Sequence, residues 1–456
     1  MEHHKEPKGL KAQIKTKDGI TRPIKIKDSF RQGGVLSVLQ YATVMDEIAK
    51  ELDKEGKGIT INKDEKIGCL LWMDDVVLIA DTEKELKEML STTKRIADNY
   101  HIVFGEAKSK VMTTNKKHEE KTITMGDVKL EPTEKYKYLG EIINNRQNVK
   151  DQIEETRKKA EGALQTILTI AGDPTLKNIE MEVVWKLVET CIIPIITYGG
   201  ETWDMTKKDT ISANRILDNI IKRLLMVPTT TPRETLYEEL KILDIEHTVI
   251  KNRINMLHRL ENTKNNMINK IMSIKNEKSW TEKTKKIMEG KKIKDISHMT
   301  KGQAKKEITK RIEISMEETI QKGRETKSKV QFLIDNKKPI WTKKRATYLG
   351  TMTRYDTSII FKARTRMLDI KNNFRGKYRD LKCRACGEED ETQEHVLGRC
   401  RGIHREDKTR VENEEIFSED ITELKDTAGK IRRILTKLSA EHENAHPGDL
   451  GEGMQN

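Results

Sequence analysis

Apolar and polar positions alternate over short stretches in the first third of the chain and follow helical spacing in the remainder. The alternation predicts short strands, and the capping-box spacing of Thr82 and Glu85 predicts the start of a helix. The expected elements are two short strands in 11–28, a helix over 31–50, a hairpin over 67–80, a helix over 82–99, and strands over 101–112 and 135–143. This order indicates an α+β core.

After about residue 146 the pattern becomes almost wholly helical. Helices are expected over 183–198 with an interruption at Pro194, over 211–226, and over 236–260. The Lys- and Asn-rich stretch that follows fits either long exposed helices or a partly disordered linker. We therefore divide the chain into an α+β part, a helical region, a basic connector, a small Cys/His-containing module and a charged flexible tail, at 1–145, 146–260, 261–335, 336–405 and 406–456.

Charge is distributed unevenly along the 456 residues. The whole chain has a formal net charge of +13. Residues 251–380 alone contain 35 Lys and Arg and 14 Asp and Glu, a net charge of 35 − 14 = +21, which leaves −8 for the rest. Such an excess favours a polyanionic partner, most simply nucleic acid, although solvated lysine-rich helices would give the same composition. No apolar run is long enough to span a membrane, so no membrane partner is expected.

Three of the five cysteines form a cluster with a histidine. Their spacing is Cys383-x2-Cys386-x8-His395-x4-Cys400, and three thiolates with one imidazole suit a closed tetrahedral Zn²⁺ site. The alternative is a chance cluster. Cys69 and Cys191 lie in apolar runs, so the cysteines together indicate a reducing compartment and a metal rather than disulfides. His404 is a nearby imidazole that we do not expect to be a ligand.

An acidic pair interrupts an otherwise apolar segment, residues 70–79 (LLWMDDVVLI). A hairpin here would place Asp74 and Asp75 at its tip, where rigid strands support two outward-pointing carboxylates. Mg²⁺ ions that act on phosphates need hard oxygen ligands held in this way. The alternative is an ordinary solvated turn.

Four blocks, in order, resemble the palm of reverse transcriptases of non-LTR, long-interspersed-element-type retrotransposons. They are residues 30–37 (FRQGGVLS), 72–75 (WMDD), 105–110 (GEAKSK) and 137–140 (KYLG). Residues 146–260 resemble the helical thumb that follows the palm in these elements, and the Cys/His segment resembles their C-terminal zinc-binding segment. The resemblance thus implies a partial palm, a helical thumb or connector and a small zinc-binding domain.

The resemblance implies roles for particular residues. Asp74 would bind Mg²⁺, and Asp75 would be a second ligand or a support. Lys108 would lie near the triphosphate as a general acid; the alternative for Lys108 is an ordinary surface lysine. Two Mg²⁺ ions would activate the primer 3′ hydroxyl and stabilise the leaving pyrophosphate. Template- or substrate-binding positions would be Arg31, Gln32, Gly33, Met73, Leu139 and Gly140.

The chain also departs from the family pattern. Val38 stands where the family has proline, and neither Asp18 nor Asp28 has the sequence setting of the family's first catalytic aspartate. We therefore expect a reverse-transcriptase-family protein that lacks the fingers and one carboxylate and does not polymerise alone. Its partners would be an RNA template and a DNA primer or target, in a nuclear or cytoplasmic ribonucleoprotein. The alternatives are a non-catalytic RNA- or DNA-binding protein and one half of a split enzyme whose partner chain supplies the missing parts.

Overall fold

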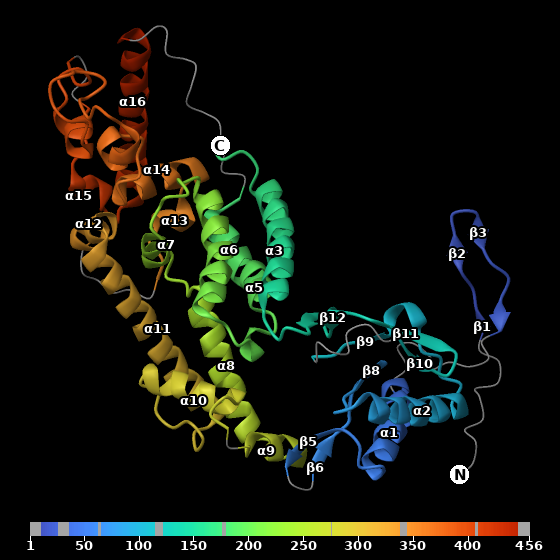
Figure 1. Ribbon diagram of the computed structural model, residues 1–456. Coiled ribbons are helices and arrows are strands. Elements are labelled where there is room, and N and C mark those ends of the chain that lie inside the picture. Colours follow the sequence, from blue (N-terminus) through green and yellow to red (C-terminus); the bar gives the residue numbers. More distant parts are fainter. Residues whose placement is uncertain are drawn as a thin grey trace. The chain divides into compact units, whose positions relative to one another are not determined.

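The chain forms two compact units, residues 1–147 and 148–456. The structure, a computed structural model, describes residues 11–25, 36–62, 65–114, 122–175, 179–274, 276–337, 344–405 and 409–445 (Figure 1). The first unit mixes helices with small sheets and the second is almost entirely helical, which confirms the predicted α+β class. No helix in the described ranges combines the length and apolarity needed to cross a membrane.

The first unit contains short paired strands and two helices. Its strands are β1 Lys11–Ala12, β2 Lys15–Thr16, β3 Gly19–Ile20, β4 Ile24–Lys25, β5 Ile59–Asn62, β6 Glu65–Ile67, β7 Cys69–Trp72, β8 Asp75–Leu78, β9 Lys110–Val111, β10 Ile123–Met125, β11 Val128–Pro132, β12 Lys135–Tyr138 and β13 Glu141–Asn144. Its helices are α1 Ser37–Lys54 and α2 Glu83–Asn99. The Thr82 hydroxyl accepts a hydrogen bond from the Glu85 backbone N–H at 3.2 Å, so the predicted N-cap of α2 is confirmed.

The predicted hairpin over 67–80 is present as β7 and β8. Strand alternation places Leu71 and Val76 on the face that packs against α1 and α2, whereas Leu70 and Trp72 point to the exposed face. The helical side chains beneath the hairpin are buried: Met45, Ile48, Leu52, Met89 and Ile96. The buried side chains of α1 and α2 therefore support the β7–β8 hairpin.

The predictions for 101–112 and 135–143 are wrong in detail. Only Lys110–Val111 of the first segment is a strand, and it follows a 3-10 turn at Glu106–Lys108. The second segment is not one strand but the hairpin β12–β13, because Leu139 and Gly140 adopt φ values of 48° and 87°. Positive φ at both central residues is the geometry of a tight hairpin turn that matches strand twist. Strands β10 and β11 also form a hairpin that the sequence pattern did not reveal.

The second unit packs most of its helices around one large core, and parts of α8, α10 and α11 around a second, smaller one. The helices are α3 Lys150–Ala171, α4 Met181–Leu187, α5 Ile193–Thr197, α6 Lys207–Leu225, α7 Arg233–Leu240, α8 Ile245–Glu261, α9 Asn266–Met272, α10 Trp280–Gly290, α11 Lys301–Thr326, α12 Ser328–Asn336, α13 Tyr348–Thr351, α14 Arg354–Arg364, α15 Asn413–Ile416 and α16 Ile421–Ala445. Helix α6 contacts both α3 and α8 (Figure 1). The core extends from Ile153 in α3 to Leu438 in α16.

Three helical predictions need correction. The segment around Pro194 is not broken, because a π-helical turn at Val188–Ile192 leads into α5 with Pro194 in its first turn, where the missing N–H costs little. The segment over 236–260 is two helices, since Lys241 takes a φ of 53° and ends α7. The expectation of a flexible tail is wrong for α16, whose apolar stripe joins the core: Leu424, Ala428, Ile431, Ile434 and Leu438.

A buried ion network joins several of these helices. The Glu239 carboxylate accepts hydrogen bonds from the Tyr348 hydroxyl at 2.7 Å and from Lys337 Nζ at 3.0 Å. Arg364 lies 3.4 Å from the same carboxylate and donates to the backbone carbonyls of Ile416 and Ser418. Burial alone would raise the pKa of Glu239, but the charges of Lys337 and Arg364 and the Tyr348 hydroxyl outweigh it and lower the pKa to about 2.

The low pKa of Glu239 predicts a defined loss of stability in acid. Its folded pKa lies below the ordinary glutamate value of 4.5, so the stabilisation is present above pH 4.5 and is lost as the pH falls towards 2. We expect this residue to account for about 3 kcal/mol of the free energy of unfolding over that interval. Urea unfolding of wild-type protein and a Glu239→Gln variant measures it. The variant should be less stable at pH 6 and should show a shallower decline between pH 5 and 2; parallel profiles would contradict the prediction.

Candidate functional site

The acidic pair occupies the tip of the β7–β8 hairpin. Trp72 pairs with Asp75 at the end of the ladder, so Met73 and Asp74 form a two-residue loop and Asp75 begins β8. Both carboxylates are exposed. Met73 has a φ of 56°, a left-handed conformation that disfavours a bulky side chain and often marks functional loops. The sequence prediction of two carboxylates at a hairpin tip is confirmed in geometry.

Two tyrosines from other elements lie within electrostatic reach of the carboxylates. The pKa of Tyr41, on α1, is raised by burial and by the charge of Asp74. The pKa of Tyr138, on β12, is raised by burial and by the charges of Asp75 and Cys69. Tyr41 therefore lies within electrostatic range of Asp74, and Tyr138 within range of Asp75. From the sequence, Tyr138 was singled out only as part of the 137–140 block, and Tyr41 was not a predicted site residue, because only the folded chain brings them near the acidic pair.

Strand β12 also contacts the segment that contains Lys108. The Tyr136 hydroxyl donates to the Lys108 backbone carbonyl at 2.9 Å. Because side chains two positions apart share a strand face, Tyr136 and Tyr138 point to the same side of β12. One strand thus touches the Lys108 segment at one end and lies near Asp75 at the other. The Lys108 side chain itself is exposed.

The remaining predicted substrate positions divide into two groups. Met73 is exposed at one hairpin tip, and Leu139 and Gly140 form the turn of the β12–β13 hairpin. Arg31, Gln32 and Gly33 lie outside the described residues. The roles that the sequence resemblance assigns to all of these positions stay predictions.

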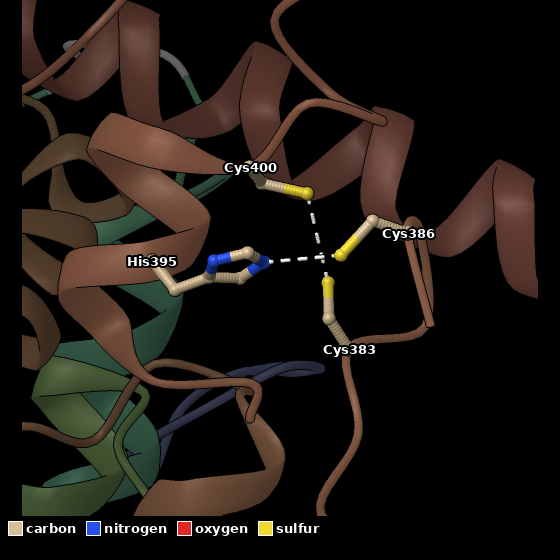
Figure 2. Close-up of side chains that lie close together, drawn as sticks. All are labelled: Cys383, Cys386, His395 and Cys400. Atoms are coloured by element: carbon tan, nitrogen blue, oxygen red, sulfur yellow. Dashed lines mark hydrogen bonds between the residues drawn. The ribbon is translucent and has the colours of Figure 1, made fainter. Parts of the chain in front are cut away.

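The four Cys/His side chains lie close together, as their spacing in the sequence predicted. Figure 2 shows the side chains of Cys383, Cys386, His395 and Cys400 directed at one point, and their ligand atoms all lie within 4.8 Å of one another. The Sγ atoms of Cys383 and Cys400 are 3.7 Å apart, and Cys386 Sγ is 3.3 Å from His395 Nε2. A Zn²⁺ ion with Zn–S distances of about 2.3 Å has tetrahedral edges of roughly 3.8 Å between sulfurs. A disulfide needs about 2.05 Å, so these residues fit a metal instead.

The residues around the cluster hold its ligands in place. The backbone N–H groups of Ala385 and Cys386 and the Cys400 thiol donate to Cys383, and the Cys400 interaction contributes most to lowering the pKa of the Cys383 thiol to about 5. Sharing that proton raises the pKa of Cys400. His395 Nδ1 lies 3.2 Å from the Glu389 carboxylate, which orients the ring with Nε2 towards the sulfurs.

The acidic and polar residues before His395 are structural. Glu391 is fully buried and accepts hydrogen bonds from the Arg384 side chain at 2.7 to 3.0 Å. Gln393 donates to the Ala363 carbonyl at 2.9 Å, which ties the segment to α14. His404 Nε2 lies 3.1 Å from the Val396 carbonyl.

Comparison with known proteins adds to this geometry. Residues 2–143 match the family model described as reverse transcriptase (RNA-dependent DNA polymerase). The matched segment contains the acidic pair, Lys108 and most of the β12–β13 hairpin. Over 233 residues, 48% of this chain, the sequence is 25% identical to the Pol polyprotein of the type-1 retrotransposable element R2 of Nasonia vitripennis.

Residues 2–143 are therefore a segment of the reverse transcriptase family. The chain is also similar to a Caenorhabditis elegans protein described as transposon-derived, with 25% identity over 169 residues, 36% of this chain. The alignments span 59% of the Caenorhabditis protein and 21% of the Nasonia polyprotein. The family resemblance drawn from the four sequence blocks is confirmed, and the expectation that the chain is an incomplete copy stays a prediction.

Proposed function

We propose that this chain contributes the metal-binding hairpin of the palm to RNA-directed DNA synthesis. The observation that carries the proposal is the exposed pair Asp74 and Asp75 at a hairpin tip within the segment that matches the reverse-transcriptase family. Two Mg²⁺ ions at such carboxylates would activate the primer 3′ hydroxyl and stabilise the leaving pyrophosphate. The packed base of the hairpin on α1 and α2 would keep the carboxylates fixed, and the reaction gains from such preorganisation.

The neighbouring residues would position the substrates. Lys108 would lie near the triphosphate, and its link to β12 through Tyr136 supports a place beside the acidic pair. The exposed turn of Leu139 and Gly140 and the exposed Met73 would contact the primer end and the nucleotide. Gln32 and Gly33 would let the backbone approach the nucleotide closely, and Arg31 would bind template or substrate beside them. In this assignment residues 1–145 are the palm part and residues 146–260 are the thumb-like region.

A third carboxylate would come from outside these 456 residues. Asp18 and Asp28 are the acidic residues between positions 7 and 30, and neither has the expected sequence setting. A longer form of the chain or a second chain would then supply the missing aspartate and the fingers. The other partners would be an RNA template and a DNA primer or target.

The Cys/His cluster would bind a structural Zn²⁺ ion. Support comes from the four convergent ligand atoms, the separations that match tetrahedral edges, and the Glu389 contact to His395. Thiolate ligands of this kind persist in a reducing compartment, the nucleus or cytoplasm. Phe374 and Tyr378, which precede the cluster, would contact single-stranded nucleic acid, because aromatic side chains stack on bases. Lys329 and Lys377 stack on the Phe374 ring at 4.8 and 5.3 Å, so this aromatic lies among cations.

One observation favours a second candidate function. The net charge of +21 over residues 251–380 would suit a non-catalytic RNA- or DNA-binding protein derived from such an element. The acidic pair would then have no catalytic role.

Primer extension separates the two functions. The assay uses poly(rA)/oligo(dT) with Mg²⁺ and the purified chain, with and without an added N-terminal segment from a related full-length element. We expect no synthesis by the chain alone and synthesis after complementation. Synthesis by the chain alone would refute the need for an outside carboxylate. No synthesis in either case, with salt-sensitive RNA binding intact, would favour the binding protein.

A further inference from the structure

A single hydroxyl group joins strand β12 to the backbone of Lys108. The Tyr136 hydroxyl donates a hydrogen bond of 2.9 Å to the Lys108 carbonyl, 28 residues earlier in the chain. Tyr136 directly precedes the 137–140 block and is not among the residues to which the sequence resemblance assigns a role. The bond connects it to a residue that does have such a role, so we asked what else holds Lys108 in place.

Local hydrogen bonds fold the Lys108 segment into a tight turn. The Gly105 carbonyl accepts from the Lys108 backbone N–H at 3.2 Å and ends the 3-10 turn of Glu106–Lys108. The Ser109 backbone N–H and hydroxyl donate to the same carbonyl at 3.0 and 2.9 Å. Because these bonds span at most four residues, they shape the turn without fixing its place relative to the strands.

Strand pairing fixes the chain only beyond Lys108. Strand β9 begins at Lys110 and pairs in parallel with residues 131–132 of β11. The bond from Tyr136 anchors the backbone two residues earlier, at Lys108 itself. Without this bond, the position of Lys108 would depend on its own turn and on a ladder that starts two residues away.

The 105–110 block contains two lysines, and their surroundings differ. Lys110 Nζ lies 2.6 Å from the Glu131 carboxylate, and its hydrogen bond and charge lower the pKa of Glu131. Lys108 is exposed, and within the described part of the chain its ammonium group has no acidic partner. An anionic substrate would therefore meet the charge of Lys108, whereas the charge of Lys110 is already offset.

Strand β12 also relates Lys108 to the acidic pair. Tyr136 and Tyr138 are two positions apart, so their side chains share one face of the strand and lie about 7 Å apart along it. Burial and then the charge of Asp75 raise the pKa of Tyr138, which places this tyrosine within electrostatic range of Asp75. A shift of Lys108 relative to β12 would therefore also be a shift relative to the acidic pair.

We propose that Tyr136 is a positioning residue for DNA synthesis: its hydroxyl fixes the backbone of Lys108 and thereby holds the Lys108 ammonium group at the triphosphate. The inference rests on the proposed function, because it needs a reaction in which Lys108 takes part. Tyr136 itself would touch neither substrate nor metal. A misplacement of about 1 Å can cost about 100-fold in rate, so a single hydrogen bond at this point would matter.

Incorporation of dTTP in the complemented primer-extension reaction tests the proposal with the full chain. Tyr136→Phe removes the hydroxyl and keeps the ring. It should lower kcat at least about fivefold and leave KM for dTTP within about twofold, because a general acid acts in the transition state rather than in substrate binding. The matched control is Tyr100→Phe, the same change at an exposed tyrosine of the first unit, which should keep kcat within about twofold.

A double-mutant cycle separates positioning of Lys108 from general support of the fold. Lys108→Ala alone should lower kcat by about 100-fold, a usual contribution of a general acid. Adding Tyr136→Phe to Lys108→Ala should cause no further loss, because the hydroxyl would have no ammonium group left to position. A tyrosine that only stabilises the first unit would lower kcat by the same factor in both backgrounds.

Equal fractional losses in the two backgrounds would overturn the inference, as would a wild-type kcat for Tyr136→Phe. Both results leave the proposed function standing, because the complemented wild type still synthesises DNA. Absence of synthesis by the complemented wild type would overturn the proposed function and this inference together. Amide hydrogen exchange gives a readout without activity: residues 105–111 should exchange at least about twofold faster in Tyr136→Phe than in Tyr100→Phe. Equal exchange would show that the hydroxyl does not fix the segment.

Discussion

In the complemented primer-extension reaction, replacing Asp74 with Asn is expected to lower the rate of DNA synthesis by at least about 1,000-fold. The amide keeps the size of the side chain but removes the charge that would hold Mg²⁺ at the hairpin tip. Metal ions contribute several kcal/mol of transition-state stabilisation, and each 1.36 kcal/mol corresponds to a factor of ten in rate. Single-turnover extension with a preformed template–primer complex isolates the chemical step.

Asp81→Asn is the matched control for this variant. Asp81 is exposed and lies just beyond β8, so the control makes the same chemical change a few residues from the hairpin tip. We expect its rate to stay within about twofold of the wild type, since surface substitutions away from special features have small effects. Equal losses in both variants would show that the effect is not specific to the acidic pair.

Loss of the metal ligand Cys383 is expected to unfold the segment around the cluster. The Cys383 and Cys400 side chains are buried in the large core of the second unit, together with Val396, Leu397 and Ile403. Structural Zn²⁺ in zinc-finger peptides contributes an apparent binding free energy of about 10–16 kcal/mol near neutral pH. Cys383→Ser should therefore abolish stoichiometric zinc binding and lower Tm by at least about 5 °C.

Zinc content by mass spectrometry and thermal unfolding by circular dichroism check this prediction. Cys191→Ser is the control, because Cys191 is exposed and lies outside the cluster. It should retain one zinc per chain and an unchanged Tm. A Cys383→Ser protein that keeps the wild-type zinc content and Tm would show that the cluster is no structural zinc site.

Local signals in the sequence were sufficient for several elements. The apolar runs on either side of the acidic pair in residues 70–79 predict β7 and β8, and Thr82 with its hydroxyl predicts the start of α2. The cysteine spacing predicts the metal cluster, since a knuckle and two further ligands leave few alternative geometries. In each case the physical cause lies within a few residues of the feature.

Other features depend on contacts that sequence periodicity does not reveal. The turn at Leu139 and Gly140 requires leucine in a left-handed conformation, which leucine seldom adopts, so Gly140 by itself was too weak a signal for the turn. Helix α16 looks like a charged tail because its apolar stripe is narrow among many charged residues, and only the second unit's core shows what covers the stripe. Tyr41 and Tyr138 reach the acidic pair from elements 33 and 63 residues away along the chain.

A metal switch at Asp74 tests most directly whether this carboxylate binds a catalytic metal. Asp74→Cys replaces a hard oxygen ligand with a softer thiolate, which binds Mg²⁺ poorly and Mn²⁺ or Cd²⁺ better. In complemented primer extension we predict synthesis at least about 100-fold below wild type with Mg²⁺ and recovery of at least about tenfold when Mn²⁺ or Cd²⁺ is added. Wild-type rates for Asp74→Cys with Mg²⁺, or a loss that neither metal restores while Asp81→Cys stays active, would contradict Asp74 as a metal ligand.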